Sequence, residues 1–314
     1  MSLERGVRDG LLIVDKAPGM TSHDVVSLTR RALSTRSVGH AGTLDPMATG
    51  VLVVGCGVAT RLLRFLAADN KRYLGTLTLG VATDSLDAQG AVVGEAPVPC
   101  GLDRDRVQQL SRSFVGRFEQ RVPLVSAVKQ GGEALYRKAW RGEKVTAPVR
   151  AVVVHALEVV RVEGCHVQFD VSCGKGFYVR SLARDLAEAL GTVGHLSALR
   201  RVQSGAFGVD DALAVETLRA AKVNGPARQR VIEHMLPLAE SVAGMSTVRV
   251  DPGGADHLRH GRPAPLCHVL EPAGPADLPP VGAEPLAVFA VDGSLVAIAT
   301  RESDCLRVVR GFPS

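Results

Sequence analysis

In the middle of the chain, the hydrophobic pattern changes its period from two residues to about 3.6. Residues 166–173, HVQFDVSC, alternate between polar and apolar side chains, as in a strand that buries one face. Residues 177–190, FYVRSLARDLAEAL, then repeat apolar residues at helical spacing, and Gly191 suits the C-terminal cap of a helix. This succession requires a fold that mixes a sheet with helices. It also places Tyr178 and Arg180 at the start of the helix, close to the end of a strand.

The chain up to residue 245 repeats this mixture of strands and helices. A Thr21-x-x-Asp24 capping signal opens one predicted helix, and the DSLDAQG stretch at 84–90 has the composition of a hairpin turn. Further strands are predicted at 10–16, 51–57 and 71–79, and further helices at 103–115 and within 212–245.

The composition of the chain changes after residue 245. Four short apolar segments, TVRV, LAVFAV, LVAIAT and LRVVRG, are separated by glycine, proline and acidic clusters. These features predict a small β-rich domain over 246–314, with an irregular loop at 270–284. The sequence therefore favours an α+β domain at 1–245 followed by a β-barrel-like domain.

Several classes of protein do not fit this composition. The apolar runs are far shorter than the ~20 residues needed to cross a bilayer, and the N-terminus lacks the apolar segment of a signal peptide. The six cysteines show no pair with the two-residue spacing of a zinc or redox motif, so we expect reduced thiols. The sequence therefore predicts a cytoplasmic protein without a membrane partner.

Positive charge is concentrated in one window of the chain. Residues 121–150 contain seven lysines and arginines and two glutamates, an excess of +5 that equals the net charge of all 314 residues. Tyr136 and Trp140 lie among these charges. The window is consistent with a solvated helix face that carries two core aromatics. It is equally consistent with an arm that grips nucleic acid through phosphate contacts and stacking.

The stretch GHAGTLDPMATG at 39–50 contains a single acid, Asp45, and no lysine or arginine. Pro46 disfavours helical geometry at Asp45, and the surrounding glycines allow backbone or ligand to approach closely. On these residues alone, a turn aspartate that binds its own backbone is the simpler interpretation.

Five stretches together resemble the TruB family of RNA pseudouridine synthases. GHAGTLDPMATGVL resembles the family's signature, and the other four match in the family's order. They are GLLIVDKAPGMTSHD at 10–24, KRYLGTLTLGVATDSLDAQG at 71–90, GFYVRSLARDL at 176–186 and HLSALRR at 195–201. LPLAESVA at 236–243 also fits the end of the family's catalytic domain, so the matches cover most of residues 10–245. The β-rich segment after residue 245 lies where the family has a small RNA-binding domain of the PUA type.

The resemblance implies a fold and a reaction. The expected fold is that of pseudouridine synthases, with a mixed, mainly antiparallel sheet flanked by helices. The expected activity is the isomerisation of one uridine to pseudouridine in the T loop of tRNA, without metal or organic cofactor, by a monomer that needs no protein partner. A non-catalytic factor that binds or folds RNA on the same fold is the alternative, and a different RNA substrate is a further one.

The resemblance also implies three catalytic residues. Asp45 matches the catalytic acid, which attacks C1′ or C6 or takes a proton from C2′. Arg180 matches the arginine that pairs with this acid, although periodicity alone would make it a surface residue of a helix. Tyr73 matches the aromatic residue that stacks on the flipped base.

Other expected contacts follow from the same resemblance. Tyr178 and Leu199 match residues that line the uracil pocket. His40 matches the histidine associated with base flipping, and Lys16 matches a residue at the margin of the pocket. The expected contacts to the RNA backbone are Lys129, Arg137, Lys138, Arg141, Arg200 and Arg201.

Overall fold

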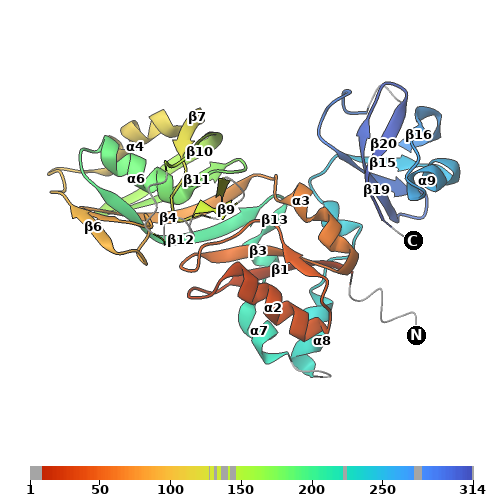
Figure 1. Ribbon diagram of the computed structural model, residues 1–314, viewed down its shortest axis with the longest axis horizontal. Coiled ribbons are helices and arrows are strands. Elements are labelled where there is room, and N and C mark those ends of the chain that lie inside the picture. Colours follow the sequence, from red (N-terminus) through yellow and green to blue (C-terminus); the bar gives the residue numbers. More distant parts are fainter. Residues whose placement is uncertain are drawn as a thin grey trace.

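The computed structural model describes residues 9–126, 128–130, 133–135, 141, 146–221, 225–271 and 278–312. Its main sheet has ten strands and runs through the centre of the molecule (Figure 1). In sheet order, the strands are β14 (Leu213–Ala214), β1 (Gly10–Lys16), β3 (Thr49–Cys56), β12 (Gly194–Ser204), β4 (Lys71–Leu79), β11 (His166–Cys173), β10 (Val149–Glu163) and β7 (Gly116–Arg121), with β2 (Val38–His40) on β3 and β13 (Phe207–Gly208) on β12.

The sheet is mixed. Among the strand pairs that the structure describes in it, β1 with β14 and β3 with β12 run parallel, whereas the others run antiparallel. The predicted mixed, mainly antiparallel sheet is thereby confirmed. The parallel pair β3–β12 lies at the centre of the sheet and brings the end of the Asp45 loop next to Arg200 and Arg201.

Helices cover the two halves of the sheet (Figure 1). The helices α2 (Ser22–Leu33), α7 (Val215–Ala220) and α8 (Pro226–Glu233) pack beside β1 and β3. At the other end, α6 (Val179–Ala189) packs on β12 and β4, and α4 (Arg104–Ser111) packs on β10. The predicted capping box of α2 is present, with Thr21 and Asp24 bonding each other's backbone N–H. Within the predicted helical segment 212–245, the described residues form β14, the two short helices α7 and α8, and a 3-10 turn at Glu240–Val242.

The strands β1 and β3 are apolar on both faces because both faces are buried. Leu12 and Leu52 belong to the hydrophobic cluster under α2, whereas Leu11 and Val53 belong to a second cluster on the opposite face. A strand buried on both sides has a continuous apolar run rather than an alternating one, which explains GLLIV and VLVV.

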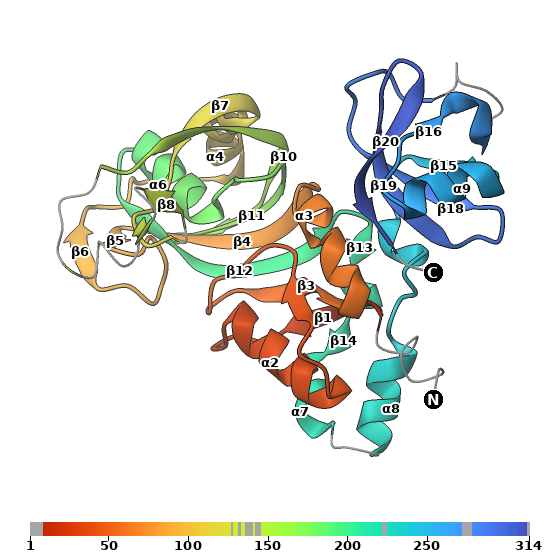
Figure 2. The ribbon, with the colours of Figure 1, turned by 45° about the vertical axis from the view of Figure 1, so that its right-hand side comes forward.

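A second sheet of six strands lies beyond the first (Figure 2). Its order is β16 (Ala264–Pro265), β20 (Cys305–Gly311), β19 (Leu295–Arg301), β18 (Leu286–Ala290), β15 (Thr247–Val250) and β17 (Val269–Glu271), and α9 (Pro252–Arg259) packs against it. Ile298 and Phe312 join the cluster formed by Leu11 and Val53, so an apolar contact connects the two sheets.

Shorter elements complete the described chain. A 3-10 turn leads into α3 (Leu63–Leu66), which lies between the two sheets (Figure 2). Two separate hairpins are formed by β5 (Val81–Thr83) with β6 (Val92–Glu95) and by β8 (Lys129–Gln130) with β9 (Glu133–Ala134). None of the helices in the described ranges is long and apolar enough to cross a membrane.

Candidate active site

A cavity of about 570 Å³ opens where the Asp45 loop, β4, β12 and the turn before α6 converge. Its volume lies within the range of roughly 300–1,000 Å³ that is typical of small-molecule sites. Five residues that the sequence analysis assigned to the site line it: Asp45, Tyr73, Tyr178, Arg180 and Leu199. Lys71, Lys175 and Arg201 add positive charge to the lining.

The loop that carries Asp45 is fixed on both sides of the acid. The Ser22 hydroxyl accepts a hydrogen bond from the Leu44 N–H at 2.9 Å and lies 3.2 Å from the Leu44 carbonyl oxygen. On the other side, the Pro46 carbonyl accepts hydrogen bonds from the Gly19 N–H at 2.9 Å and from Lys16 Nζ at 3.2 Å. The backbone leaves little freedom to the carboxylate, which therefore has a defined position in the cavity.

Gly50, at the end of this loop, cannot be replaced by a larger residue without moving the sheet. Its φ is +97°, which favours glycine, and a Cβ atom there would lie 2.1 Å from the carbonyl oxygen of Arg201. The glycine therefore permits the close β3–β12 pairing that ends the loop.

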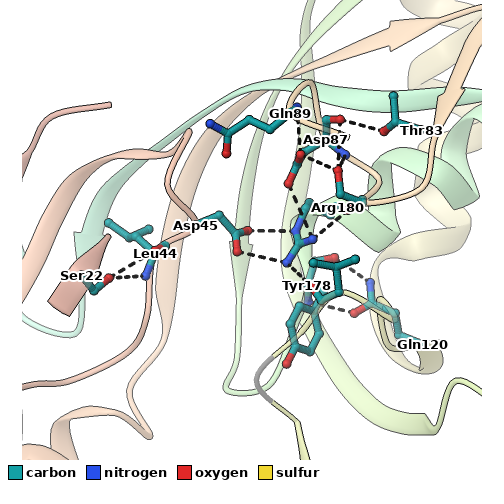
Figure 3. A network of polar contacts seen from close by, with 11 residues as sticks. Ser22, Leu44, Asp45, Thr83, Asp87, Gln89, Gln120, Tyr178 and Arg180 are labelled. Carbon is teal, nitrogen blue, oxygen red and sulfur yellow. Dashed lines mark hydrogen bonds and ion pairs between the residues drawn. The ribbon is translucent and has the colours of Figure 1, made fainter. Parts of the chain in front are cut away.

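Arg180 lies between two acids (Figure 3). Its Nη2 donates to Asp45 Oδ1 at 3.0 Å, and its Nε lies 2.9 Å from Asp45 Oδ2 as an ion-pair contact without hydrogen-bond alignment. On the far side, Nη1 lies 3.6 Å from Asp87 Oδ2. The Arg180 side chain is 5% exposed and that of Asp45 is 31% exposed, so the acid faces the cavity while the guanidinium lies behind it.

Burial raises the pKa of Asp45 above its ordinary value. The guanidinium of Arg180 lowers this pKa, and the neighbouring charge of Asp87 raises it again. The resemblance implies only that Arg180 pairs with the acid, and such a pairing favours the ionised form. Arg180 acts in this direction, but desolvation of Asp45 is the larger effect on its pKa.

Asp87 is a buried residue that the sequence analysis interpreted only as part of a turn. Its carboxylate accepts hydrogen bonds from the Ser85 hydroxyl at 2.6 Å and the Gln89 N–H at 3.0 Å. Between them, Leu86 has a φ of +63°, a conformation rarely adopted by residues other than glycine. The Leu86 carbonyl accepts a hydrogen bond from Leu196 of β12, which holds this strained turn against the sheet.

Aromatic and aliphatic side chains form the rest of the cavity wall. Tyr73 on β4 and Leu199 on β12 are buried, at 9% and 8% exposure. Tyr178 precedes α6, and the side chain of Gln120 bonds both its backbone N–H and its carbonyl. Burial raises the pKa of both tyrosines, so their hydroxyl groups remain protonated at neutral pH.

Arg201 does not lie where it was predicted. It is 1% exposed, and its guanidinium donates to the carbonyl of Val51 at 2.6 Å and to that of Gly42 at 3.1 Å. Arg201 is therefore not exposed at the surface for the predicted contact with the RNA backbone, although it lines the cavity. Alternation along β12 turns Arg200 and Arg201 to opposite faces of the sheet, and Arg201 braces the Asp45 loop instead.

Lys16 and His40 lie outside the cavity lining. Lys16 is fully buried beneath the Asp45 loop, where its Nζ donates to the Met20 carbonyl at 2.8 Å, and burial lowers its pKa to about 8. The predicted position of Lys16 at the pocket margin is thus replaced by a position under the loop. His40 is half-buried at the end of β2, and burial lowers its pKa.

The other predicted RNA contacts are only partly described. Arg200 is half-exposed and forms a two-point ion pair with Asp15 at 2.7 and 3.0 Å. Arg141 is exposed and forms a similar pair with Glu133. Lys129 lies on β8, whereas Arg137 and Lys138 lie outside the described residues.

Family models match two adjoining parts of the chain. The model described as "TruB family pseudouridylate synthase (N terminal domain)" matches residues 30–179. The model described as "tRNA pseudouridylate synthase B C-terminal domain" matches residues 180–243. Together they match residues 30–243, which contain Asp45, Arg180 and most of the main sheet, whereas β1 precedes the matched region.

Curated relatives and solved structures agree with these matches. A protein of Thermobifida fusca named tRNA pseudouridine synthase B is 42% identical over 304 residues, which cover 94% of this chain and 95% of that protein. A protein of the same name from Syntrophotalea carbinolica is 42% identical over 255 residues, 81% of each chain. The fold matches a chain in the crystal structure of a Cbf5-Nop10-Gar1 complex with a TM-score of 0.73 and 24% identity, covering 100% of this chain and 88% of that one. The chain therefore belongs to the TruB family of pseudouridylate synthases.

Proposed function

We propose that this protein isomerises one uridine to pseudouridine in the T loop of tRNA. Support comes from the family, from relatives named tRNA pseudouridine synthase B, and above all from one observation: a fixed carboxylate, Asp45, faces an open cavity while Arg180 pairs with it from behind. An RNA-folding factor without catalysis has no need of this buried charge arrangement, so we favour the enzyme.

One carboxylate is sufficient for this reaction. Hydrolysis of a glycosidic bond generally uses two carboxyl groups, because a leaving alcohol must be protonated and water must be activated. Here the N1–C1′ bond breaks, and uracil leaves as a delocalised anion, turns within the cavity and bonds to C1′ through C5. C5 then loses its proton and N1 gains one, so no water is consumed. Asp45 would act on C1′, on C6 or on the C2′ proton, and each of these roles requires the ionised form.

The walls of the cavity suit a nucleobase that has left its stack. Removing the base from the RNA costs roughly a few kcal/mol. Stacking on an aromatic ring recovers about 1–3 kcal/mol, a role that we assign to Tyr73. Tyr178 and Leu199 would complete the apolar contact with the ring.

We assign Arg180 to the ionisation of Asp45 and Asp87 to the position of Arg180. When uracil fills the cavity, water is excluded and every electrostatic contact becomes stronger. Arg180 is then the cation closest to Asp45. Asp87, held by Ser85 and Gln89, fixes the opposite side of the guanidinium.

We further propose that two parts of the chain have different functions. Residues 1–245 would form the catalytic unit and residues 246–314 an RNA-binding unit of the PUA type. Within 121–150, Lys129, Arg137, Lys138 and Arg141 would contact RNA phosphates, together with Arg200. The protein would act as a cytoplasmic monomer.

Mapping of pseudouridine in an unmodified tRNA transcript tests the proposal. The wild-type protein should modify the T-loop uridine, and Asp45→Asn should lose turnover by orders of magnitude while binding tRNA with near wild-type affinity. Asp170→Asn is a matched control, because Asp170 pairs with exposed Arg72 outside the cavity lining. Turnover of Asp45→Asn close to that of this control would contradict the assignment.

A further inference from the structure

The guanidinium of Arg180 also bonds two backbone carbonyls. Its Nη1 donates to the carbonyl of Ser85 at 2.7 Å. Its Nη2 donates to the carbonyl of Val125 at 3.0 Å. Val125 lies shortly after the end of β7, within the first residues of the basic window 121–150. The start of that window therefore contacts the arginine that faces Asp45.

Gln120 ties this segment to the start of α6 (Figure 3). Its side chain is almost fully buried, at 1% exposure, and does not line the cavity. Its Oε1 accepts from the Tyr178 N–H at 2.9 Å, and its Nε2 donates to the Tyr178 carbonyl at 3.1 Å. Tyr178 is the N-cap residue of α6 and has no side-chain capping bond of its own. Gln120 thus satisfies both backbone groups of a residue only two positions before Arg180.

A second hydrogen bond joins the same two segments. The hydroxyl of Ser181, which is fully buried, donates to the Arg121 carbonyl at 2.7 Å. Tyr178 and Ser181, which precede and follow Arg180 in the sequence, are thus both bonded to the end of β7. A shift of this strand end would move Tyr178 and Arg180 together.

We propose that Gln120 is a positioning residue for the reaction, holding Tyr178 and the guanidinium of Arg180 in register with Asp45. Residues 120–126, at the start of the basic window, would then hold the Asp45–Arg180 ion pair in a fixed orientation. This inference rests on the proposed function. The inference goes beyond that function, because the orientation of the Asp45–Arg180 pair would depend on residues 120–126. These residues lead to the proposed RNA contacts.

The fold contains a matched control for Gln120. Gln108 on α4 makes the same type of two-point bond, donating to the Leu157 carbonyl at 3.1 Å and accepting from the Val159 N–H at 2.7 Å. It joins α4 to β10 and also donates to the Ser111 hydroxyl at 3.0 Å, and neither Gln108 nor these bonded partners line the cavity. Replacing either glutamine by methionine removes one bidentate bridge and keeps a side chain of similar length.

The experiment compares Gln120→Met and Gln108→Met in the full chain, with turnover of a tRNA transcript as the readout. We expect kcat of Gln120→Met to fall by about tenfold to a hundredfold with little change in KM, as for a small displacement of catalytic groups. Gln108→Met should keep wild-type kcat, although both variants lose thermal stability. The charged groups acting on Asp45 are Arg180, Asp87 and Lys16. If Arg180 moves away, the acid limb of the pH profile should also shift to higher pH in Gln120→Met alone.

Equal kcat and equal pH profiles for the two variants would overturn the inference while leaving the proposed function intact. A wild-type chain without pseudouridine formation would instead contradict the proposed function. If Gln120→Met does not fold, Ser181→Ala provides the same comparison, because it removes only the hydroxyl that bonds Arg121. A reduced kcat of Ser181→Ala with unchanged KM would support the proposed positioning of Arg180 by the end of β7, and a wild-type kcat would overturn it.

Discussion

Asp45 combines two requirements that oppose each other. The proposed catalytic role needs an ionised carboxylate, yet burial raises the pKa of Asp45 above the ordinary aspartate value of 3.8. As the pH falls, Asp45 should therefore take up its proton earlier than an exposed aspartate does. We expect single-turnover rates to decline on the acid side with an apparent pKa above 3.8, while circular dichroism shows that the fold persists. Full activity down to the ordinary aspartate range would contradict this expectation.

The same residue should reduce the stability of the free protein at neutral pH. A folded-state pKa above the unfolded value means that Asp45 favours folding below the unfolded pKa, and that this contribution is lost as the pH rises through the folded pKa. Asp45→Asn removes the charge and keeps the shape. Its melting temperature should exceed that of the wild type at pH 7, and the difference should shrink on acidification. A lower melting temperature at pH 7 would show that the Arg180 pair outweighs desolvation.

Individual residues could be predicted only where a motif identified them. Asp45 and Arg180 came from the resemblance, since periodicity alone favoured a turn and a surface helix. The burial of Arg201 could not be inferred, because the side to which a β12 residue points depends on a strand register that the sequence does not reveal. Asp87 lay within the recognised DSLDAQG stretch, whose composition suggested only a turn.

Among the elements, β4 and β11 pack through a glycine that the sequence did not mark as special. Gly75 pairs with Phe169, and a Cβ atom on Gly75 would lie 2.4 Å from the phenyl ring. Gly75→Ala should therefore overpack this site and lower the free energy of unfolding by about 1–3 kcal/mol in urea denaturation. Phe169→Leu should recover part of the loss in the double variant, so that the two effects are not additive. Strict additivity would exclude the clash as the cause.

Element prediction was accurate where one local signal decided the outcome. The capping box at Thr21 and the alternation of HVQFDVSC each identified their element, because the relevant partners lie within a few residues. The segment 212–245 was less predictable. Its apolar residues pack against α2 and β1 from two short helices, Val215–Ala220 and Pro226–Glu233, and this tertiary contact cannot be read from local spacing.

At the scale of the whole molecule, the two sheets are joined rather than merely linked in sequence. Besides the apolar cluster around Phe312, Arg61 and Arg64 donate to the carbonyls of Gly311 and Val309 on β20. The change in composition at residue 245 indicated a second β-rich unit. It did not indicate this contact, because the contacting residues are separated by more than 240 positions.

The uneven charge of the molecule gives a prediction about RNA binding. Neutralising phosphates releases counterions, so affinity should fall steeply with salt, with a slope set by the number of phosphate contacts. Reversing Arg137 and Lys138 to glutamate should weaken tRNA binding and flatten that slope. Reversing Arg104 and Arg161, exposed residues that pair with Glu158 and Glu163 outside the cavity lining, is the control.

The two double variants are matched in net charge. Each reversal removes two units, so both bring the chain from +5 to +1. A difference between them must then come from where the charges lie. If both variants show the same dependence of tRNA affinity on salt concentration, the attraction to tRNA comes from the net charge of the whole molecule. A flattened slope in the Arg137 and Lys138 variant alone would place the phosphate contacts in the basic window. The first residues of that window include Val125, whose carbonyl accepts a hydrogen bond from Arg180.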